Sequence, residues 1–231
     1  MEIEFFCSDL AVMETFPPIP AKLMRPDWYK DLPFYIDNKK LNAEEMQAAG
    51  RNRQNETIKA CVPVKDYIGN GYILRYPSDI MVTPTTVGDE HGWWAASDVT
   101  KCEPHSHVQC PVKMGGKKNT YFKITHPWSV KTPKGYSCYF YQPEFFLEER
   151  LKLFPGVVDT DGYDYPINFP GVITSSETFT LKAGDPMMVV FPFKRESWKH
   201  SVSFREERPN PVLLFIERGY KKLFSKQKEF K

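Results

Sequence analysis

Alternating hydrophobic and polar residues dominate the middle of the chain, from Gly71 to about Trp198. Pro, Gly, Asn and Asp separate the runs of this pattern, which are YILRYP, IMVT, GWWAAS, TYFKIT, YSCYFYQP, ETFTLK and MMVVFPF. Successive side chains of a β-strand point to opposite faces, so each run predicts a short strand with one buried face. Many short strands at this spacing predict a mainly β domain over residues 58–200, a single barrel or sandwich of jelly-roll type.

The N-terminal region, residues 1–57, is predicted to be a proline-rich arm that packs on this domain. Residues 1–10 predict one short strand, whose apolar face consists of Ile3, Phe5 and Cys7. The stretch from Thr15 to Pro33 then contains five prolines: Pro17, Pro18, Pro20, Pro26 and Pro33. Proline fixes φ and has no N–H to donate, so we expect neither a helix nor a central strand in this stretch.

One or two short helices are predicted between the arm and the first strand of the domain. Asn42 and Glu45 have the spacing of a capping box, which predicts a helix that begins after Asn42 and ends at Gly50. A second short helix is expected over residues 58–67, before a turn at Gly69-Asn70-Gly71.

The C-terminal region, residues 201–231, is predicted to contain an amphipathic helix. Asn210 is a suitable N-cap, and Pro211 suits the first helical turn. Hydrophobic residues follow roughly on one side, and lysines lie near the end, where they complement the helix dipole. Such a helix either docks on the β domain or binds a protein partner or a membrane surface.

Composition excludes several classes of protein. The 231 residues include 31 Lys and Arg against 29 Asp and Glu, so the net charge of +2 gives no signal for nucleic acid. No hydrophobic run approaches the roughly 18 residues of a membrane span. The acidic start, MEIEFFCSDL, has no basic region of a secretory signal, so we expect a cytoplasmic protein with reduced cysteines.

Several short motifs occur in a recognisable order within the strand-rich region. A turn over Thr132–Tyr136 precedes the strand that ends at Gln142-Pro143. Gly-Val-Val-Asp at 156–159 follows, and then a Gly-Asp turn at 184–185 that leads into an apolar strand. This order resembles the dUTPase and dCTP-deaminase superfamily, which has the β-clip fold, and the resemblance covers Gly71 to Phe193.

The resemblance implies roles for particular residues. Asp159 would orient a water molecule, and Tyr163 would stack on a nucleobase. Gln142 lies where the superfamily has an Arg-Ser pair that holds phosphates, and it is a ligand-binding candidate on that ground. Because the superfamily builds its sites between subunits, the resemblance also implies a homo-oligomer, with a trimer favoured. The Arg-Ser pair and a glycine-rich C-terminal lid are both absent from this sequence.

Residues 58–198 also resemble a family of bacterial and tailed-phage proteins with no established activity. The matching segments are Gly71–Ile73, His105–Gln109, Thr125–Trp128, Thr132–Tyr136, Pro155–Tyr163, Pro166–Pro170 and Pro192–Arg195. This second resemblance implies a fold and a phage-associated role, and it implies no mechanism.

Cys102, His105, His107 and Cys110 are the candidate metal ligands. Their types are those of zinc sites, and they lie within nine residues. A second interpretation uses only His105 and His107, which a strand would place on one face, as in cupin-like metalloenzymes. A third is that these histidines form hydrogen bonds within a loop.

A second candidate site consists of alternating acidic residues. Asp159, Asp161 and Asp164 could hold Mg²⁺, since carboxylate oxygens suit this ion, or they could stabilise tight turns through local hydrogen bonds. In a ligand site, Asp161, Tyr163 and Asn168 would bind the ligand beside Asp159.

Two hypotheses for function follow. The leading one is a non-catalytic ligand-binding or protein-interaction β module, because the phosphate-binding pair is missing. The alternative is an enzyme, either a divergent Mg²⁺-dependent nucleotide hydrolase that uses Asp159 and Tyr163 or a cupin-like metalloenzyme that uses His105 and His107.

Overall fold

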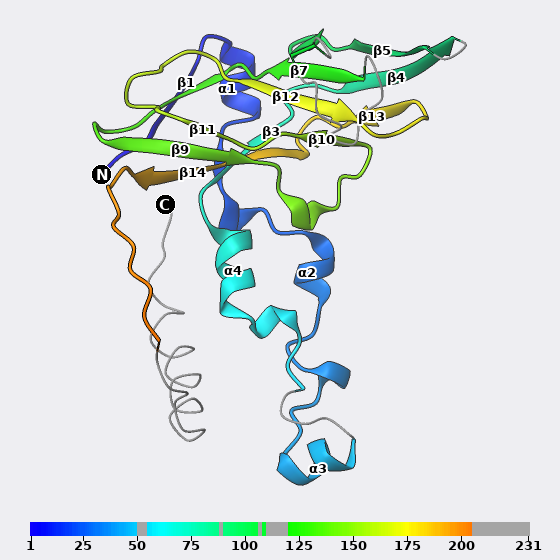
Figure 1. Cartoon of the computed structure of the whole chain (residues 1–231). Coiled ribbons are helices and arrows are strands. Elements are labelled where there is room, and N and C mark those ends of the chain that lie inside the picture. The colour runs from blue at the N-terminus through cyan, green and yellow to red at the C-terminus, as the bar shows by residue number, and fades with distance from the viewer. Residues whose placement is uncertain (50–54, 88–89, 106–107, 110–119, 205–231) are drawn as a thin grey trace. The chain divides into compact units, whose positions relative to one another are not determined.

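The chain forms two compact units (Figure 1). The structure is a computed structural model, and it describes residues 1–49, 55–87, 90–105, 108–109 and 120–204. Met1–Ile19 and Gly71–Arg195 form the first unit. Pro20–Asn70 belongs to the second unit, together with the segment that begins at Glu196. The three-part division predicted from the sequence stays a prediction.

The described strands of the first unit form four antiparallel sheets. One sheet pairs β1 (Glu4–Cys7) with β8 (Trp128–Lys131). The second contains, in order, β10 (Leu151–Leu153), β12 (Asn168–Ile173), β7 (Tyr121–Thr125) and β6 (Lys101–Pro104). The third contains, in order, β11 (Gly156–Val158), β9 (Tyr136–Tyr141), β14 (Pro186–Lys194), β3 (Tyr72–Arg75) and the two-residue β2 (Ile19–Pro20). The last contains β13 (Phe179–Leu181), β4 (Ile80–Val87) and β5 (Glu90–Ala96).

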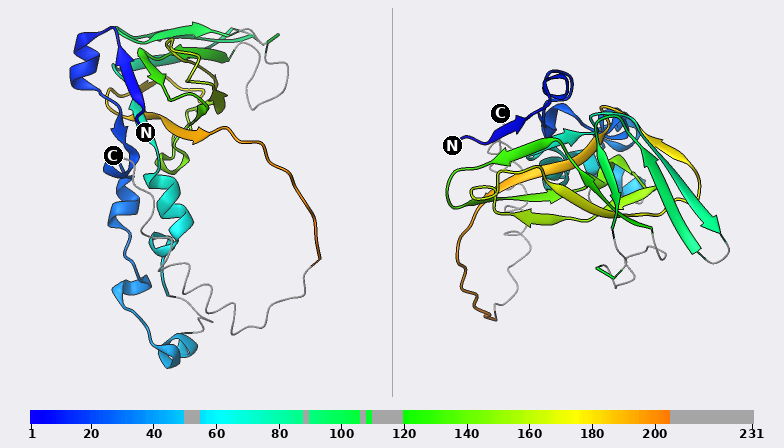
Figure 2. Two further views of the ribbon diagram at one scale, coloured as in Figure 1. Left: turned by 90° about the vertical axis from the view of Figure 1, so that its left-hand side faces the viewer. Right: turned by 90° about the horizontal axis from the view of Figure 1, so that it is seen from above.

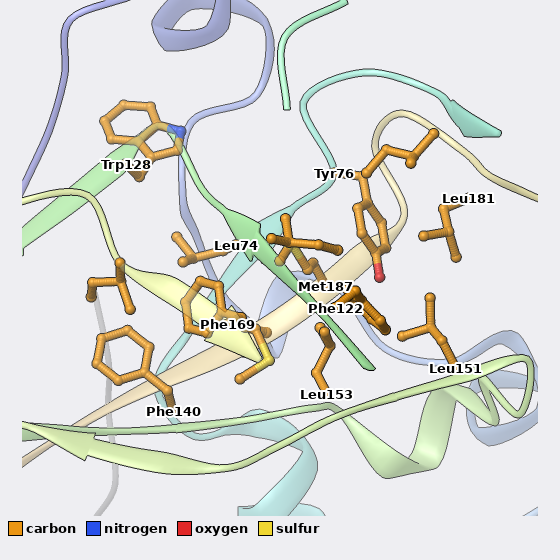
Figure 3. Close-up of a cluster of buried hydrophobic side chains, with 14 of the residues drawn as sticks. Leu74, Tyr76, Phe122, Trp128, Phe140, Leu151, Leu153, Phe169, Leu181 and Met187 are labelled. Carbon is orange, nitrogen blue, oxygen red and sulfur yellow. The ribbon is translucent and has the colours of Figure 1, made fainter. Parts of the chain in front are cut away.

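These sheets share one hydrophobic core. On β9, Cys138 and Phe140 are buried in it, whereas Tyr139 between them points outward and is exposed. Figure 3 shows the side chains of Phe140, Phe169 and Leu153 directed toward one another from three different strands. The alternation seen in the sequence is therefore the alternation between core and surface.

The prediction of a mainly β domain is confirmed. The seven predicted runs correspond to β3, β4, β5, β7, β9, β13 and β14. No sheet closes on itself within the described residues, so the arrangement is a sandwich of β-clip or jelly-roll type. Four further strands, β6, β8, β10 and β11, have only three or four residues, too few to show a period.

The N-terminal strand is also confirmed, with its apolar residues Ile3, Phe5 and Cys7 packed against the core. It continues into α1 (Leu10–Thr15), which was not predicted. Asp9 caps this helix, because its carboxylate accepts a hydrogen bond from the Val12 N–H at 3.1 Å. Both views in Figure 2 place α1 at the border of the sheets.

The second unit is helical in its described part. Its elements are η1 (Ala21–Leu23), α2 (Asp27–Asp31), η2 (Ile36–Asn38), α3 (Ala43–Ala48), η3 (Ile58–Ala60) and α4 (Val62–Gly69). The predicted capping box is confirmed at α3, where Asn42 and Glu45 each accept the other's backbone N–H at 2.9 Å. The helix expected over residues 58–67 is present as η3 followed by α4.

The prediction that the proline-rich stretch contains no helix is wrong. The helix α2 lies between Pro26 and Pro33, in a segment of the arm without proline. Pro26 occupies the N-cap position, where its missing N–H costs no helical hydrogen bond. The chain passes from the first unit to the second at β2 (Ile19–Pro20).

The predicted C-terminal helix, residues 210–231, lies outside the described residues. Within the described part of the chain, no helix has the length and hydrophobicity needed to cross a membrane.

Candidate functional site

Two turns of the first unit lie against each other and contain most of the motif residues named above. The first turn, Thr132–Tyr136, joins β8 to β9, and Gly135 in it has a φ of +86°. The second, Asp159–Tyr163, follows β11. In the second turn the backbone oxygen of Asp159 accepts the N–H groups of Gly162 and Tyr163, both at 3.0 Å. Backbone hydrogen bonds therefore fix the direction in which the Asp159 side chain leaves the strand.

Thr160 connects the two turns from inside the protein. Its side chain is fully buried, and its hydroxyl lies 2.7 Å from the hydroxyl of Thr132 and 3.4 Å from the Cys138 sulfur. The Thr132 N–H also donates to the backbone oxygen of Thr160 at 3.2 Å. A buried hydroxyl with partners holds its surroundings in one arrangement, because losing those partners costs about 1–3 kcal/mol.

Arg195, one residue after β14, supplies the positive charge of the site. Its guanidinium donates to both carboxylate oxygens of Asp161, with Nη1 2.8 Å from Oδ1 and Nη2 bonded to Oδ2. The Gly135 N–H donates to Oδ2 of the same carboxylate at 2.8 Å. The Arg195 N–H donates to the Gly135 oxygen at 2.8 Å. Two parallel bonds between guanidinium and carboxylate fix both orientation and distance.

Asp159 contacts the same arginine. Its Oδ1 accepts a hydrogen bond from the Ser137 hydroxyl at 2.7 Å and lies 3.1 Å from Arg195 Nη1. The Asp159 side chain is 68% exposed, whereas Ser137 is fully buried. We call Thr132, Gly135, Ser137, Asp159, Thr160, Asp161 and Arg195 the turn cluster.

The charges of the turn cluster stabilise one another. Hydrogen bonds from Arg195 make the largest contribution to lowering the pKa of Asp161 to about 2, and the hydrogen bond from the Gly135 N–H contributes less. The hydrogen bond to Asp161, together with the negative charges of Asp159 and Asp161, raises the pKa of the Arg195 guanidinium. Arg195 therefore lies between two carboxylates in the manner of a bound cation. Among the described residues no three His, Cys, Asp or Glu side chains converge as metal ligands.

Tyr163 lies at the exposed side of the second turn. Its hydroxyl donates to the Pro166 oxygen at 3.4 Å, and its ring meets the ring of Tyr165 edge-on at 5.7 Å. Tyr165 is 66% exposed, and Asp164 between them is exposed as well. The two rings are therefore accessible to a ligand or partner.

The other predicted ligand-binding residues form separate contacts. The Gln142 side chain bridges to β10, where it accepts the Leu153 N–H at 2.9 Å and donates to the Leu151 oxygen at 3.5 Å. Asn168 accepts the Thr125 hydroxyl at 2.5 Å, across the β12–β7 pair. The structure thus links Asp159 and Asp161 through Arg195, and it gives Gln142 and Asn168 partners of their own.

The predicted metal ligands lie only in part within the described residues, since His107 and Cys110 fall outside them. Cys102 is on β6 and packs against the core, where burial raises the pKa of its thiol to about 12. Zinc binds the thiolate, which this environment disfavours. The cavity beside Cys102 is lined by hydrophobic side chains alone, among them Trp93 and Phe122. The zinc site stays a prediction.

Sequence reasoning found the two aspartates and missed Arg195, Ser137 and Thr160. A signal was present, because Arg195 ends the Pro-Phe-Lys-Arg motif and Thr132 opens Thr-Pro-x-Gly-Tyr. Three motifs far apart in the chain meet in one hydrogen-bonded network.

A first prediction concerns the ionisation of Asp161. Replacing Arg195 by Met should raise the Asp161 pKa from about 2 toward its ordinary value of 3.8, because the strongest hydrogen bonds to the carboxylate are lost. The Arg195–Asp161 pair stabilises the fold at pH values above 3.8, the ordinary pKa of the carboxyl group. That contribution is lost as the pH falls to the folded-state pKa of about 2. A carbon-detected NMR titration of the side-chain carboxyl measures the change. Lys134→Met, which removes an exposed neighbouring charge, is the control, and an equal shift there would contradict the assignment to Arg195.

The comparisons with known proteins give structural neighbours alone. No family model matches the chain, and no curated protein matches its sequence. Solved structures that match include the EIAV dUTPase, with 14% identity, a TM-score of 0.34, and coverage of 60% of this chain and 86% of that one. A variant dUTPase of Staphylococcus bacteriophage 80alpha matches with 9% identity, a TM-score of 0.34, and coverage of 62% and 86%. A variant dUTPase from phage phi11 of S. aureus matches with 12% identity, a TM-score of 0.32, and coverage of 59% and 85%.

Proposed function

We propose that the first unit is a non-catalytic β module that binds a ligand or a protein partner on the surface beside the turn cluster. The observation that carries this proposal is the position of Arg195, which is bonded to both Asp159 and Asp161. The sequence resemblance to bacterial and tailed-phage proteins supports a phage-associated role.

The contacts of Arg195 favour binding over hydrolysis. A nucleotide hydrolase needs cationic groups directed at the phosphates as charge develops there. In this chain the guanidinium of the turn cluster is directed at two carboxylates, and its contact with Asp161 is bidentate. A phosphate group would therefore have to compete with two carboxylates for this guanidinium.

The surface beside the turn cluster offers exposed aromatic and apolar groups. Tyr163 and Tyr165 follow the second turn. On the adjacent β11–β9 pair, Val157 is 59% exposed and lies opposite Tyr139, which is also exposed. Aromatic rings with a polar end provide contact area at low entropy cost and stack on planar groups. This surface therefore supports recognition of a planar ligand or an apolar partner segment.

The test compares turnover with binding. We expect purified protein with dUTP and Mg²⁺ to release no more pyrophosphate than Asp159→Asn, because the described residues of the turn cluster direct their cation at carboxylates. Release that disappears in Asp159→Asn would reject the proposal in favour of a hydrolase.

The binding part is tested with dUMP, which has a base for stacking and no phosphoanhydride bond. At one hundred times its Kd, a ligand adds about 2.7 kcal/mol to stability, which a melting curve detects. We expect stabilisation without Mg²⁺ that is lost in Tyr163→Ala and kept in Asp159→Asn. A melting temperature that dUMP leaves unchanged would exclude nucleotide binding, and the proposed function would then be binding of a protein partner.

A further inference from the structure

The strand β5 has one unpaired edge. It is the last strand in the order β13–β4–β5, and β4 is its only partner among the described strands. Figure 1 shows it on the far side of β4 from β13. Within the described part of the chain, no backbone hydrogen bond reaches its other edge. Such an edge presents N–H and C=O groups that can pair with another strand.

Other edge strands of this unit carry features that discourage pairing. The strands β10, β11 and β13 have three residues each. The strand β6 has four, of which Lys101 and Glu103 are charged and Pro104 cannot donate a hydrogen bond. The strand β5 has seven residues. Its acidic residue, Glu90, comes first, and Gly92–Ala96 is free of charge and proline. Among the described edge strands, β5 is thus the longest, and its run Gly92–Ala96 has no charged residue that would discourage pairing.

One face of β5 packs on the hydrophobic core, and the other face is exposed to solvent. Trp93 and Ala95 pack against the core, and the Trp93 Nε1–H donates to the Tyr121 oxygen at 3.3 Å. The strand is therefore held in place. Trp94 points to the opposite face and is 46% exposed, with Ala96 exposed on the same side. Met81 of β4, opposite Ala96, is 39% exposed.

We propose that β5 pairs antiparallel with β5 of a second copy of this chain, about a two-fold axis. A two-fold places the same strand on both sides, so the edge must be complementary to itself. The uncharged run Gly92–Ala96 meets this condition, because no like charges are brought together. The two three-stranded sheets become continuous, and the exposed Trp94 side chains of both copies lie on one face near the axis.

Pairing through β5 produces a closed dimer. The opposite edge of the same sheet is β13, whose three residues offer little backbone for further strands. The turn cluster is not part of this interface, so the proposal does not depend on the proposed function. It also differs from a trimer, because a two-fold axis relates two copies.

The test is the molar mass of the full chain, measured by light scattering after gel filtration. We expect a dimer for the unmodified protein and a monomer for Trp94→Lys, since a lysine at the edge repels its symmetry mate. Ala96→Lys is a second disrupting variant that keeps the tryptophan. Val157→Lys, at an exposed position of the edge strand β11, is the matched control and should stay dimeric.

Hydrogen exchange locates the interface. The amides within Trp93–Ala96 that point away from β4 should be protected in the dimer and lose that protection in Trp94→Lys, while those of β9 stay unchanged. A monomeric unmodified protein would overturn the proposal. So would a dimer or trimer that persists in both lysine variants, or a dimer whose β5 amides exchange as fast as in the monomeric variant.

Discussion

Replacing Gly71 by Ala is expected to lower the free energy of unfolding by about 3–4 kcal/mol. Gly71 has a φ of +78°, a conformation that costs a residue with a Cβ about 1–2 kcal/mol. In addition, that Cβ would lie 2.4 Å from the Val190 backbone oxygen. Because Val190 lies within the β14–β3 ladder, its backbone can move only by disturbing two paired strands. Urea unfolding followed by tryptophan fluorescence measures the loss.

Gly135→Ala separates the two causes. Gly135 has a similar φ of +86°, but a Cβ added to it would have no heavy atom within 4 Å beyond its chain neighbours. It should therefore lose only the conformational contribution, about 1–2 kcal/mol. Equal losses in the two variants would show that the contact with Val190 contributes nothing.

Stability is expected to fall by about 3 kcal/mol as the pH drops from 7 toward 4, owing to His126 alone. His126 is fully buried, and burial lowers its pKa from 6.5 to about 4. Its Nε2 donates to the Arg75 oxygen at 3.0 Å, and its Nδ1 accepts the Trp128 N–H at 3.3 Å. A second proton on Nδ1 would face that N–H.

The sign of this effect follows from proton binding. Between pH 6.5 and 4 the unfolded chain binds a proton at this histidine and the folded chain does not, so acid favours unfolding. The contribution is complete above pH 6.5 and is lost as the pH falls to about 4. Denaturant unfolding at several pH values measures the slope. His126→Gln keeps a donor and an acceptor but does not titrate, so its slope between about pH 5 and 6.5 should be shallower. An unchanged slope would contradict the assignment to His126.

The strands could be predicted where one face is buried and the other is not. β7 shows this, because Phe122 and Ile124 are buried in the core whereas Lys123 and Thr125 between and after them are only partly buried. The strand β12 shows no alternating run, because Gly171, Val172 and Ile173 are all buried. Length was the other obstacle, since the three residues of β10 or β11 contain too little pattern.

The candidate site was predictable only where its residues are close in sequence. Asp159 and Asp161 lie in one motif, so their proximity needed no fold. Arg195 reaches them because β14 pairs with β9 in a register that places Lys194 opposite Tyr136. Sequence patterns reveal that both strands exist, but register depends on how the sheets pack, and one residue of slip would move Arg195 to the other face.

The position of Arg195 has a mechanical consequence. It is the last residue of the first unit, and the chain leaves toward the second unit at Glu196. Its side chain donates hydrogen bonds to the Asp161 carboxylate, and its backbone N–H donates to the Gly135 oxygen. Force applied through the following segment therefore meets an ion pair and a backbone hydrogen bond before it reaches the β14 ladder. Tension on the chain beyond residue 195 must therefore break these contacts of the turn cluster before it separates β14 from its neighbouring strands.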